Sequence, residues 1–125
     1  MKKFLIAAFA VTVTTGMPVA EDVAADDFYK DKQIVLTIAT PPGGGFNAYG
    51  RNVAKFIVKH LPSGSSIIVK NMPGAGGRKA TAWLDQIAPR DGSNFLGTMP
   101  GSLVEPILGD PKRVKYKPLE FNYIG

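Results

Sequence analysis

Several residue types that carry chemistry are missing or scarce. The chain has no cysteine and one histidine, His60, which excludes disulfides, thiolate nucleophiles and a zinc cluster of cysteines and histidines. A nucleophilic serine would need His60 as its base. This histidine closes a predicted helix, where a cation complements the helix dipole, so we interpret it as structural. Carboxylates are not paired for acid–base work. We therefore expect no enzymatic activity, no metal site and no cofactor.

Acidic residues are also in the minority, with 10 Asp and Glu against 15 Lys and Arg and a net charge of +5 at pH 7. Most basic residues are scattered, and only Lys112–Lys117 forms a basic run. A nucleic-acid reader usually gathers its cations on one face or interleaves them with stacking aromatics. We interpret the run as a solvated loop and expect no nucleic-acid binding.

A long hydrophobic run is absent too. The apolar stretch from Phe4 to Val13 is shorter than the ~20 residues that span a bilayer. Lys2-Lys3 precede it and more polar residues follow, which is the layout of a secretory signal. We predict a signal peptide over residues 1–25 with cleavage after Ala25, cleavage after Ala20 or an uncleaved anchor being the alternatives. Residues 26–125 would then form one small periplasmic domain.

Glycine and proline, in contrast, are abundant, with 14 and 10 residues, and they form two loops. Pro41-Pro42-Gly43-Gly44-Gly45 follows the apolar run Ile34–Ala39, and Asn71-Met72-Pro73-Gly74-Ala75-Gly76-Gly77 follows Ile67–Val69. A helical pattern follows each loop. A strand that passes through glycines into a helix exposes backbone N–H groups beside a positive helix end, which is a receptor for anions. Tight turns between strands and helices are the structural alternative.

The remaining pattern predicts an α/β fold with parallel strands and right-handed crossovers. The elements that we expect, in chain order, are a strand at Ile34–Ala39, a helix at Ala48–His60, a strand at Ile67–Val69, a helix at Arg78–Ile87, a strand at Asn94–Thr98, a helix at Gly101–Leu108 and the start of a strand at Phe121–Ile124. Asn47 should cap the first helix, in which Tyr49, Val53, Phe56, Ile57 and His60 fall at helical spacing on one face. Ile87 would end the inner stripe of the second helix. Both glycine loops should lie at the carboxyl edge of the sheet, where such folds bind ligands.

Two nucleotide-binding motifs fit the first loop only in part. Gly43 to Ala48 satisfies the dinucleotide pattern G-x-G-x-x-A, but the acidic residue required at the end of the next strand is replaced by Lys70 and Asn71. A phosphate-binding P-loop would need Lys and Ser or Thr where the chain has Arg51 and Asn52. The P-loop is discarded, and a dinucleotide-binding enzyme fragment stays as the alternative function.

The ordered blocks resemble the extracytoplasmic solute receptors of tripartite tricarboxylate transporters. The residues that carry the resemblance are Pro41–Gly45, Arg51, Asn71–Gly76, Ala88–Gly92 and Phe121–Gly125. It implies a periplasmic binding protein fold of type II, of which this chain would be the first part of domain 1 with the second domain absent. It also implies a monomer that captures a small organic acid, such as a di- or tricarboxylate, and delivers it to membrane permease subunits.

The resemblance also implies which residues contact the carboxylate, through backbone N–H groups and water. These are Gly43, Gly44, Gly45, Phe46, Asn47, Pro73, Gly74, Ala75 and Gly76, with Ser102 as a hydroxyl donor at the end of the third strand. Many family members have Thr-Asp where this chain has Phe46-Asn47, which removes a negative charge beside the pocket. Family members are also longer. We therefore expect weak carboxylate binding by this chain alone, a truncated non-functional product being the further alternative.

Overall fold

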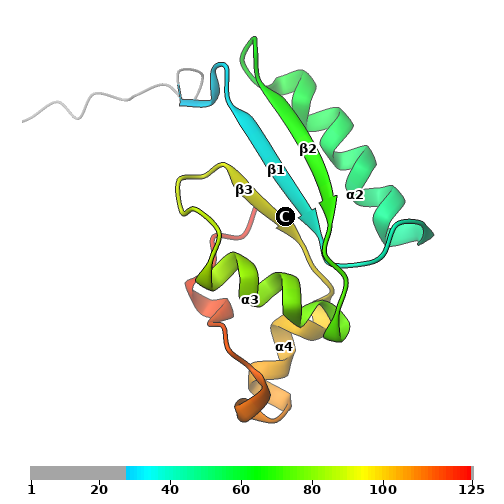
Figure 1. Cartoon of the computed structure of the whole chain (residues 1–125), viewed down its shortest axis with the longest axis vertical. Coiled ribbons are helices and arrows are strands. Elements are labelled where there is room, and N and C mark those ends of the chain that lie inside the picture. Colours follow the sequence, from blue (N-terminus) through cyan, green and yellow to red (C-terminus); the bar gives the residue numbers. More distant parts are fainter. Residues whose placement is uncertain (1–27, 125) are drawn as a thin grey trace, which may run out of the picture.

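Three parallel strands form the centre of the structure, a computed structural model that describes residues 28–124 (Figure 1). They are β1 (Gln33–Ile38), β2 (Ser66–Asn71) and β3 (Asn94–Gly97), in the order β2-β1-β3. The α/β class with parallel strands is thus as predicted. The predicted signal peptide and both cleavage sites lie outside the described residues.

Helices connect the strands and follow the last one. They are α2 (Gly44–Ile57), which continues into a 3-10 turn at Val58–His60, α3 (Arg78–Gln86), which follows a 3-10 turn at Ala75–Gly77, and α4 (Pro100–Leu108). Two further 3-10 turns, Pro111–Arg113 and Pro118–Glu120, belong to the last segment. Among the described residues, no helix combines the length and the apolar character that a membrane crossing requires.

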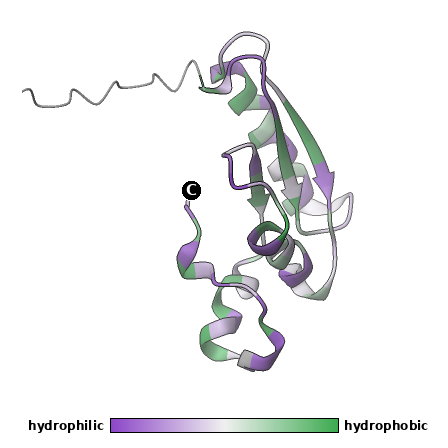
Figure 2. Ribbon diagram, turned by 60° about the vertical axis from the view of Figure 1, so that its left-hand side comes forward, coloured by the Kyte–Doolittle hydropathy of each residue, from purple (hydrophilic) through white to green (hydrophobic). Residues whose placement is uncertain are grey.

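The core lies on both faces of the central strand β1, and the strands are apolar over most of their length (Figure 2). Ile34 and Ile38 are fully buried. Ile38 faces α2, because a Cβ at Gly50 would lie 2.7 Å from its Cδ1 atom. On the opposite face, Ala39 lies next to Gly77, where the chain enters α3. The connections that leave β1 and β2 therefore lie on opposite faces of the sheet.

The start of α2 differs from the prediction. The helix begins at Gly44 instead of Ala48, and its N-cap residue is Gly43, so the prediction that Asn47 caps it is wrong. Gly43 and Gly44 have φ angles of +87° and +73°. This left-handed conformation, which glycine adopts without strain, turns the chain into the helix earlier than a loop of three glycines suggests.

The buried face of α2 also differs from the prediction. Tyr49 and Phe56 are 69% and 58% exposed, whereas Asn47 and Ala54 are buried. The helix approaches Ile38 closely at Gly50, and such an approach requires small residues on the facing side. The size of the residues, and not their hydrophobicity alone, therefore selects the face. Ile87 was expected in the inner stripe of the second helix but is 70% exposed.

The last segment packs against α3 and α4 without forming a strand. Residues 121–124 have no strand pairing within the described part of the chain, so the prediction of a fourth strand at Phe121–Ile124 is wrong there. Instead, Tyr123 donates a hydrogen bond to the Pro118 carbonyl at 2.8 Å.

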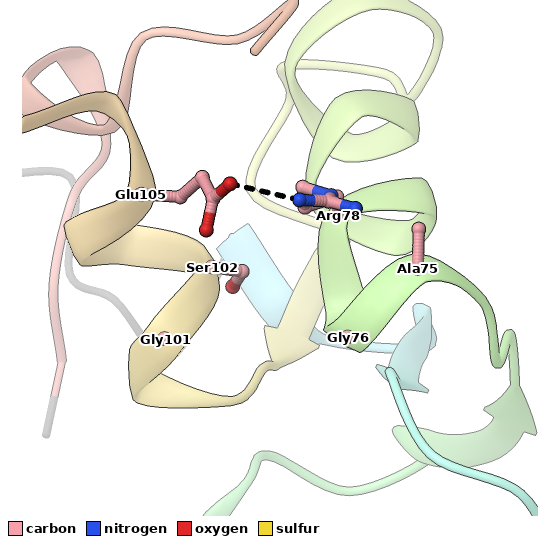
Figure 3. A pocket seen from close by; sticks show the side chains of 6 residues that line it. All are labelled: Ala75, Gly76, Arg78, Gly101, Ser102 and Glu105. Atoms are coloured by element: carbon pink, nitrogen blue, oxygen red, sulfur yellow. Dashed lines mark hydrogen bonds and ion pairs between the residues drawn. The ribbon is translucent and has the colours of Figure 1, made fainter. Parts of the chain in front are cut away.

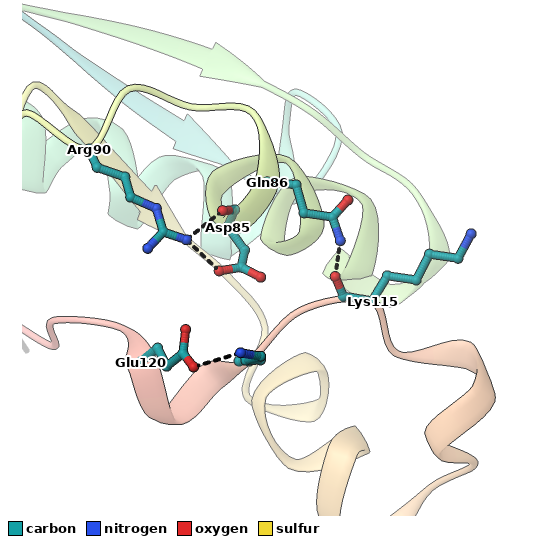
Figure 4. Close-up of polar contacts among 6 residues, drawn as sticks. Asp85, Gln86, Arg90, Lys115 and Glu120 are labelled. Atoms are coloured by element: carbon teal, nitrogen blue, oxygen red, sulfur yellow. Dashed lines mark hydrogen bonds and ion pairs between the residues drawn. The ribbon is translucent and has the colours of Figure 1, made fainter.

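Polar contacts link this segment to α3 and stabilise its turns (Figure 4). The Gln86 side chain donates to the Lys115 carbonyl, and Lys117 pairs with Glu120 at 2.9 Å. Nearby, Arg90 pairs with Asp85 at 3.2 Å across the end of α3. The segment is therefore attached along α3, although it adds no strand to the sheet.

Candidate functional site

Three helices begin at the same edge of the sheet. Helix α2 follows the carboxyl end of β1, α3 follows that of β2, and α4 follows that of β3 (Figure 1). Because the strands are parallel neighbours, both glycine loops and the β3–α4 connection lie side by side at this edge, as the sequence predicts. We call this edge the carboxyl edge.

Within the described residues, the N-termini of the three helices lack first-turn acidic residues and side-chain caps of their own. A 3-10 turn before α3, however, bonds the Gly77 and Arg78 N–H groups to the Gly74 and Ala75 carbonyls. The first N–H groups of a helix have no partner within the helix, and together with the helix dipole they attract anions. The carboxyl edge is therefore electropositive even before charged side chains are considered.

The glycines of the first loop stand in open space. A Cβ at Gly43, Gly44 or Gly45 would meet no atom within 4 Å, and all three residues are exposed. The φ angle of Gly45 is not in the left-handed region. Neither backbone conformation nor packing therefore explains glycine at position 45, whereas close approach of another molecule to the backbone would explain it.

The second loop is packed more closely. A Cβ at Gly77 would lie 3.0 Å from Thr98 Oγ1, and a Cβ at Gly74 would lie 3.1 Å from Lys79 Cδ. Gly76 has a φ angle of +64° but open space around it. The turn therefore requires glycine for structural reasons at 74 and 77, and it leaves Gly76 exposed to solvent.

Buried hydroxyl groups support the second loop from below. The Thr81 hydroxyl donates to the Gly77 carbonyl at 3.0 Å. Thr98 Oγ1 lies 3.0 Å from Thr81 Oγ1 and 2.8 Å from Ser102 Oγ. Tyr116 in turn donates to the Ser102 carbonyl, and burial raises the pKa of the Tyr116 phenol. These contacts connect the second loop to the start of α4.

A cavity of about 230 Å³ opens between the starts of α3 and α4 (Figure 3). In this cavity the Arg78 guanidinium points toward the Glu105 carboxylate, and the two groups pair at 2.9 Å with each side chain 30% exposed. The residues that line it are Ala75, Gly76, Arg78, Gly101, Ser102 and Glu105. A charged pair and the starts of two helices thus line an open pocket.

Arg51 joins the two glycine loops through amide groups. Its Nε donates to Asn47 Oδ1 at 3.0 Å and its Nη2 donates to Asn71 Oδ1 at 2.9 Å. Asn71 Nδ2 in turn donates to the Thr40 carbonyl at 2.8 Å. We call Thr40, Asn47, Arg51 and Asn71 the Arg51 cluster. It joins the residue before the first loop, the first residue of the second loop and the first turn of α2.

The structure brings the predicted contact residues to one edge but not into one cavity. Ala75, Gly76 and Ser102 line the cavity, whereas the first loop and Pro73-Gly74 lie outside its lining. Ser102 is buried, and its hydroxyl donates to the Met99 carbonyl at 2.8 Å. Phe46 packs its ring beside Gly97 at the end of β3. The predicted contact roles of all these residues stay predictions.

The sequence pattern did not single out Arg78 or Glu105, whereas Gly101 lies within the segment Thr98–Ser102 that was expected to border the site. Arg78 directly follows the second glycine run, and this position at a helix start is the one signal that could have indicated it. Asn71 occupies the position of the acidic residue in the dinucleotide pattern, and its side chain is engaged by Thr40 and Arg51. The acidic side chain that would bind the ribose hydroxyl in this pattern is therefore absent from that position.

A second cavity of about 370 Å³ adjoins the first and shares Ala75 and Arg78 with it. Lys79, Arg113 and Lys115 also line it, so that side of the carboxyl edge is basic. Within residues 28–124, no group of three or more His, Cys, Asp or Glu side chains could hold a metal ion. No protein-family model, no curated protein and no solved structure matches this chain. The resemblance to the solute receptors of tripartite tricarboxylate transporters stays a prediction.

Proposed function

We propose that this chain is the ligand-binding part of a periplasmic solute receptor that captures a small organic carboxylate for a tripartite tricarboxylate-type transporter. The single observation that carries the proposal is the meeting of three helix N-termini at one edge of a parallel sheet, with neither side-chain caps nor first-turn acids in the described residues. Backbone N–H groups in that arrangement bind carboxylates as well as phosphates. The type of transporter is proposed from the sequence resemblance, and the class of ligand from this arrangement of N–H groups.

The open first loop and the basic surroundings support the same ligand class. Gly45 leaves its backbone accessible without a structural need for glycine. Arg51 contributes a cationic side chain beside the loops, and Lys79 and Lys115 line the adjoining cavity. A carboxylate seated on the loops would remain open to solvent at Gly43–Gly45, so we expect dissociation constants in the millimolar range, about −4 kcal/mol.

Equilibrium binding of the purified chain tests the proposal. Isothermal titration with succinate, citrate and acetate should show saturable, salt-sensitive binding of the polycarboxylates at millimolar concentration. Choline, a cation, serves as the control and should not bind. NAD tests the dinucleotide alternative. Absence of binding by all three carboxylates, or tight binding of NAD, would contradict the proposal.

A further inference from the structure

The second cavity lies between α3 and the last segment of the described chain. Helix α3 contributes Arg78, Lys79 and Ala82 to its wall, and the 3-10 turn before the helix contributes Ala75. Lys79 and Ala82 are three residues apart, so they lie on the same face of the helix. Because positions 75 and 82 carry only a methyl group, this face leaves room between its longer side chains.

Two hydrogen bonds hold the opposite wall of the cavity in place. Gln86 donates to the Lys115 carbonyl, and the Lys115 side chain extends away from this contact (Figure 4). Tyr116 is buried, and its hydroxyl donates to the Ser102 carbonyl. The polar tip of Tyr116 is therefore engaged within the fold, and its ring adds apolar surface to the wall.

Four cationic side chains line the second cavity, and only two of them are paired with a carboxylate. Arg78 and Arg113 each form an ion pair, at 2.9 Å and 3.7 Å. Lys79 and Lys115 form none among residues 28–124, and the described lining of this cavity contains no acidic residue. Since an ammonium group is positively charged at neutral pH, two uncompensated charges stand beside apolar surface.

We propose that the second cavity is a separate binding site for an organic anion with an apolar body. The charged group pairs with Lys79 and Lys115, and the body packs against Ala82 and the Tyr116 ring. Binding sites for small molecules combine a mostly apolar wall with a few polar groups of this kind. A purely hydrophilic anion would leave the apolar wall in water, and a neutral apolar molecule would leave both lysines unpaired.

This site is distinct from the proposed carboxylate site. The first glycine loop and α2 contribute no residue to the lining of the second cavity. The two sites share only the start of α3, where Arg78 is already paired with Glu105. The inference therefore does not depend on the proposed function, and each can fail without the other.

Three probes separate the charge from the apolar body. Naphthalene-2-sulfonate carries both, methanesulfonate has the same charged group without the rings, and 2-naphthol has the rings and is neutral at neutral pH. In a residue-resolved amide titration, naphthalene-2-sulfonate should bind at least about tenfold more tightly than methanesulfonate, because its rings leave water. It should bind about fivefold more tightly than 2-naphthol, which lacks the ion pairs. Saturable shifts should centre on Lys79, Ala82 and Tyr116.

Two lysine variants test the charges. Lys79→Met and Lys115→Met remove a charge and keep an apolar stem, and both positions are exposed, so the fold should persist. Each should weaken naphthalene-2-sulfonate about threefold, and the double variant about tenfold. Lys55→Met is the matched control, an exposed lysine on α2 that lines neither cavity. It should change the affinity less than about 1.5-fold, because solvent and salt screen a distant charge.

Ala82→Glu tests the same cavity by adding a negative charge to its wall. The new carboxylate would pair with the lysines and should weaken naphthalene-2-sulfonate by at least about tenfold. Ala48→Glu makes the same substitution at an exposed position of α2, outside the second cavity. It should leave the affinity for naphthalene-2-sulfonate within about twofold.

Several results would overturn the inference. Equal affinity for naphthalene-2-sulfonate and 2-naphthol, or unchanged affinity in the double lysine variant, would show that the charges do not select the ligand. Shifts centred on the exposed rings of Tyr49 and Phe56 would place the probe elsewhere. Complete displacement of naphthalene-2-sulfonate by succinate would mean a single site. Failure of succinate to bind, with naphthalene-2-sulfonate bound as described, would contradict the proposed function and leave this inference standing.

Discussion

The two glycine loops look alike in sequence but differ in their surroundings. In the second loop, a side chain at Gly74 or Gly77 would press against Lys79 or Thr98. In the first loop, a side chain at any of the three glycines would meet open space. The structural explanation, a tight turn that lets a strand enter a helix, thus accounts for the second loop. It accounts for the first only through the positive φ angles of Gly43 and Gly44.

The difference assigns the loops unequal roles. The second loop is a fixed support, held by the Thr81 hydroxyl and joined through Ser102 and Tyr116 to the rest of the fold. The first loop leaves its backbone exposed, as the proposed binding of a carboxylate requires. Substitutions in the second loop should therefore change stability, whereas substitutions in the first should change binding.

The largest effect is expected at Gly77. Alanine there must adopt a φ angle of +94° and place its methyl group 3.0 Å from Thr98 Oγ1. We expect Gly77→Ala to lower the free energy of unfolding by about 2 kcal/mol. Gly76→Ala, with a φ angle of +64° in open space, is the control and should cost about 1 kcal/mol. Urea denaturation measures both free energies of unfolding. Equal losses in the two variants would contradict the view that the close contact with Thr98 sets Gly77 apart from Gly76.

Tyr116 offers a smaller test of the support beneath the second loop. Tyr116→Phe removes the hydrogen bond to the Ser102 carbonyl and should lower the free energy of unfolding by about 1 kcal/mol. Burial raises the pKa of Tyr116 above the ordinary value of 10.0. The unfolded chain therefore loses this proton first as pH rises, and stability should fall from about pH 10 upward to the raised pKa.

The comparison of unfolding curves at pH 9 and pH 11 checks this expectation. The decrease between the two should be smaller in Tyr116→Phe, because the phenylalanine does not titrate. An identical decrease in both proteins would mean that other groups cause the loss of stability at alkaline pH. In Tyr116→Phe, backbone amide hydrogen exchange should become faster at Gly77 but not at Gly45.

Gly45 should show the smallest effect on stability and an opposite sign. Its φ angle is not in the left-handed region and its surroundings are open, so Gly45→Ala should raise the free energy of unfolding by about 0.5 kcal/mol. The added methyl group would cover backbone N–H groups and weaken succinate binding. Thermal melts and the succinate titration measure the two changes. A stable variant that binds succinate normally would contradict the role of the first loop.

The strand pattern of the sequence predicted most of the architecture. The three strands lie within a few residues of the predicted ranges, because short apolar runs between proline and glycine leave little freedom in their bounds. The start of α2 was missed because Gly44 and Gly45 indicate a loop, although helix N-termini tolerate them. Phe121–Ile124 forms no strand in the described part of the chain, where no neighbouring strand receives it.

The candidate site was less accessible to sequence reasoning. Its place at the carboxyl edge followed from strand direction alone. The Arg51 cluster did not, since it depends on Asn71 reaching Arg51 from another strand end. Only the spacing of Asn47 and Arg51, one helical turn apart, is local enough to be predicted. The engagement of Ser102 by buried hydroxyls likewise depends on the packing of α3 against α4.

A residue-resolved amide titration with succinate is the sharpest test of the proposed carboxylate site. We predict that the largest shifts occur at backbone N–H groups of the carboxyl edge, at Gly44–Phe46, Gly76 and Gly101, and that they saturate together. Shifts confined to the basic run Lys112–Lys117, or no saturable shifts at millimolar succinate, would contradict it.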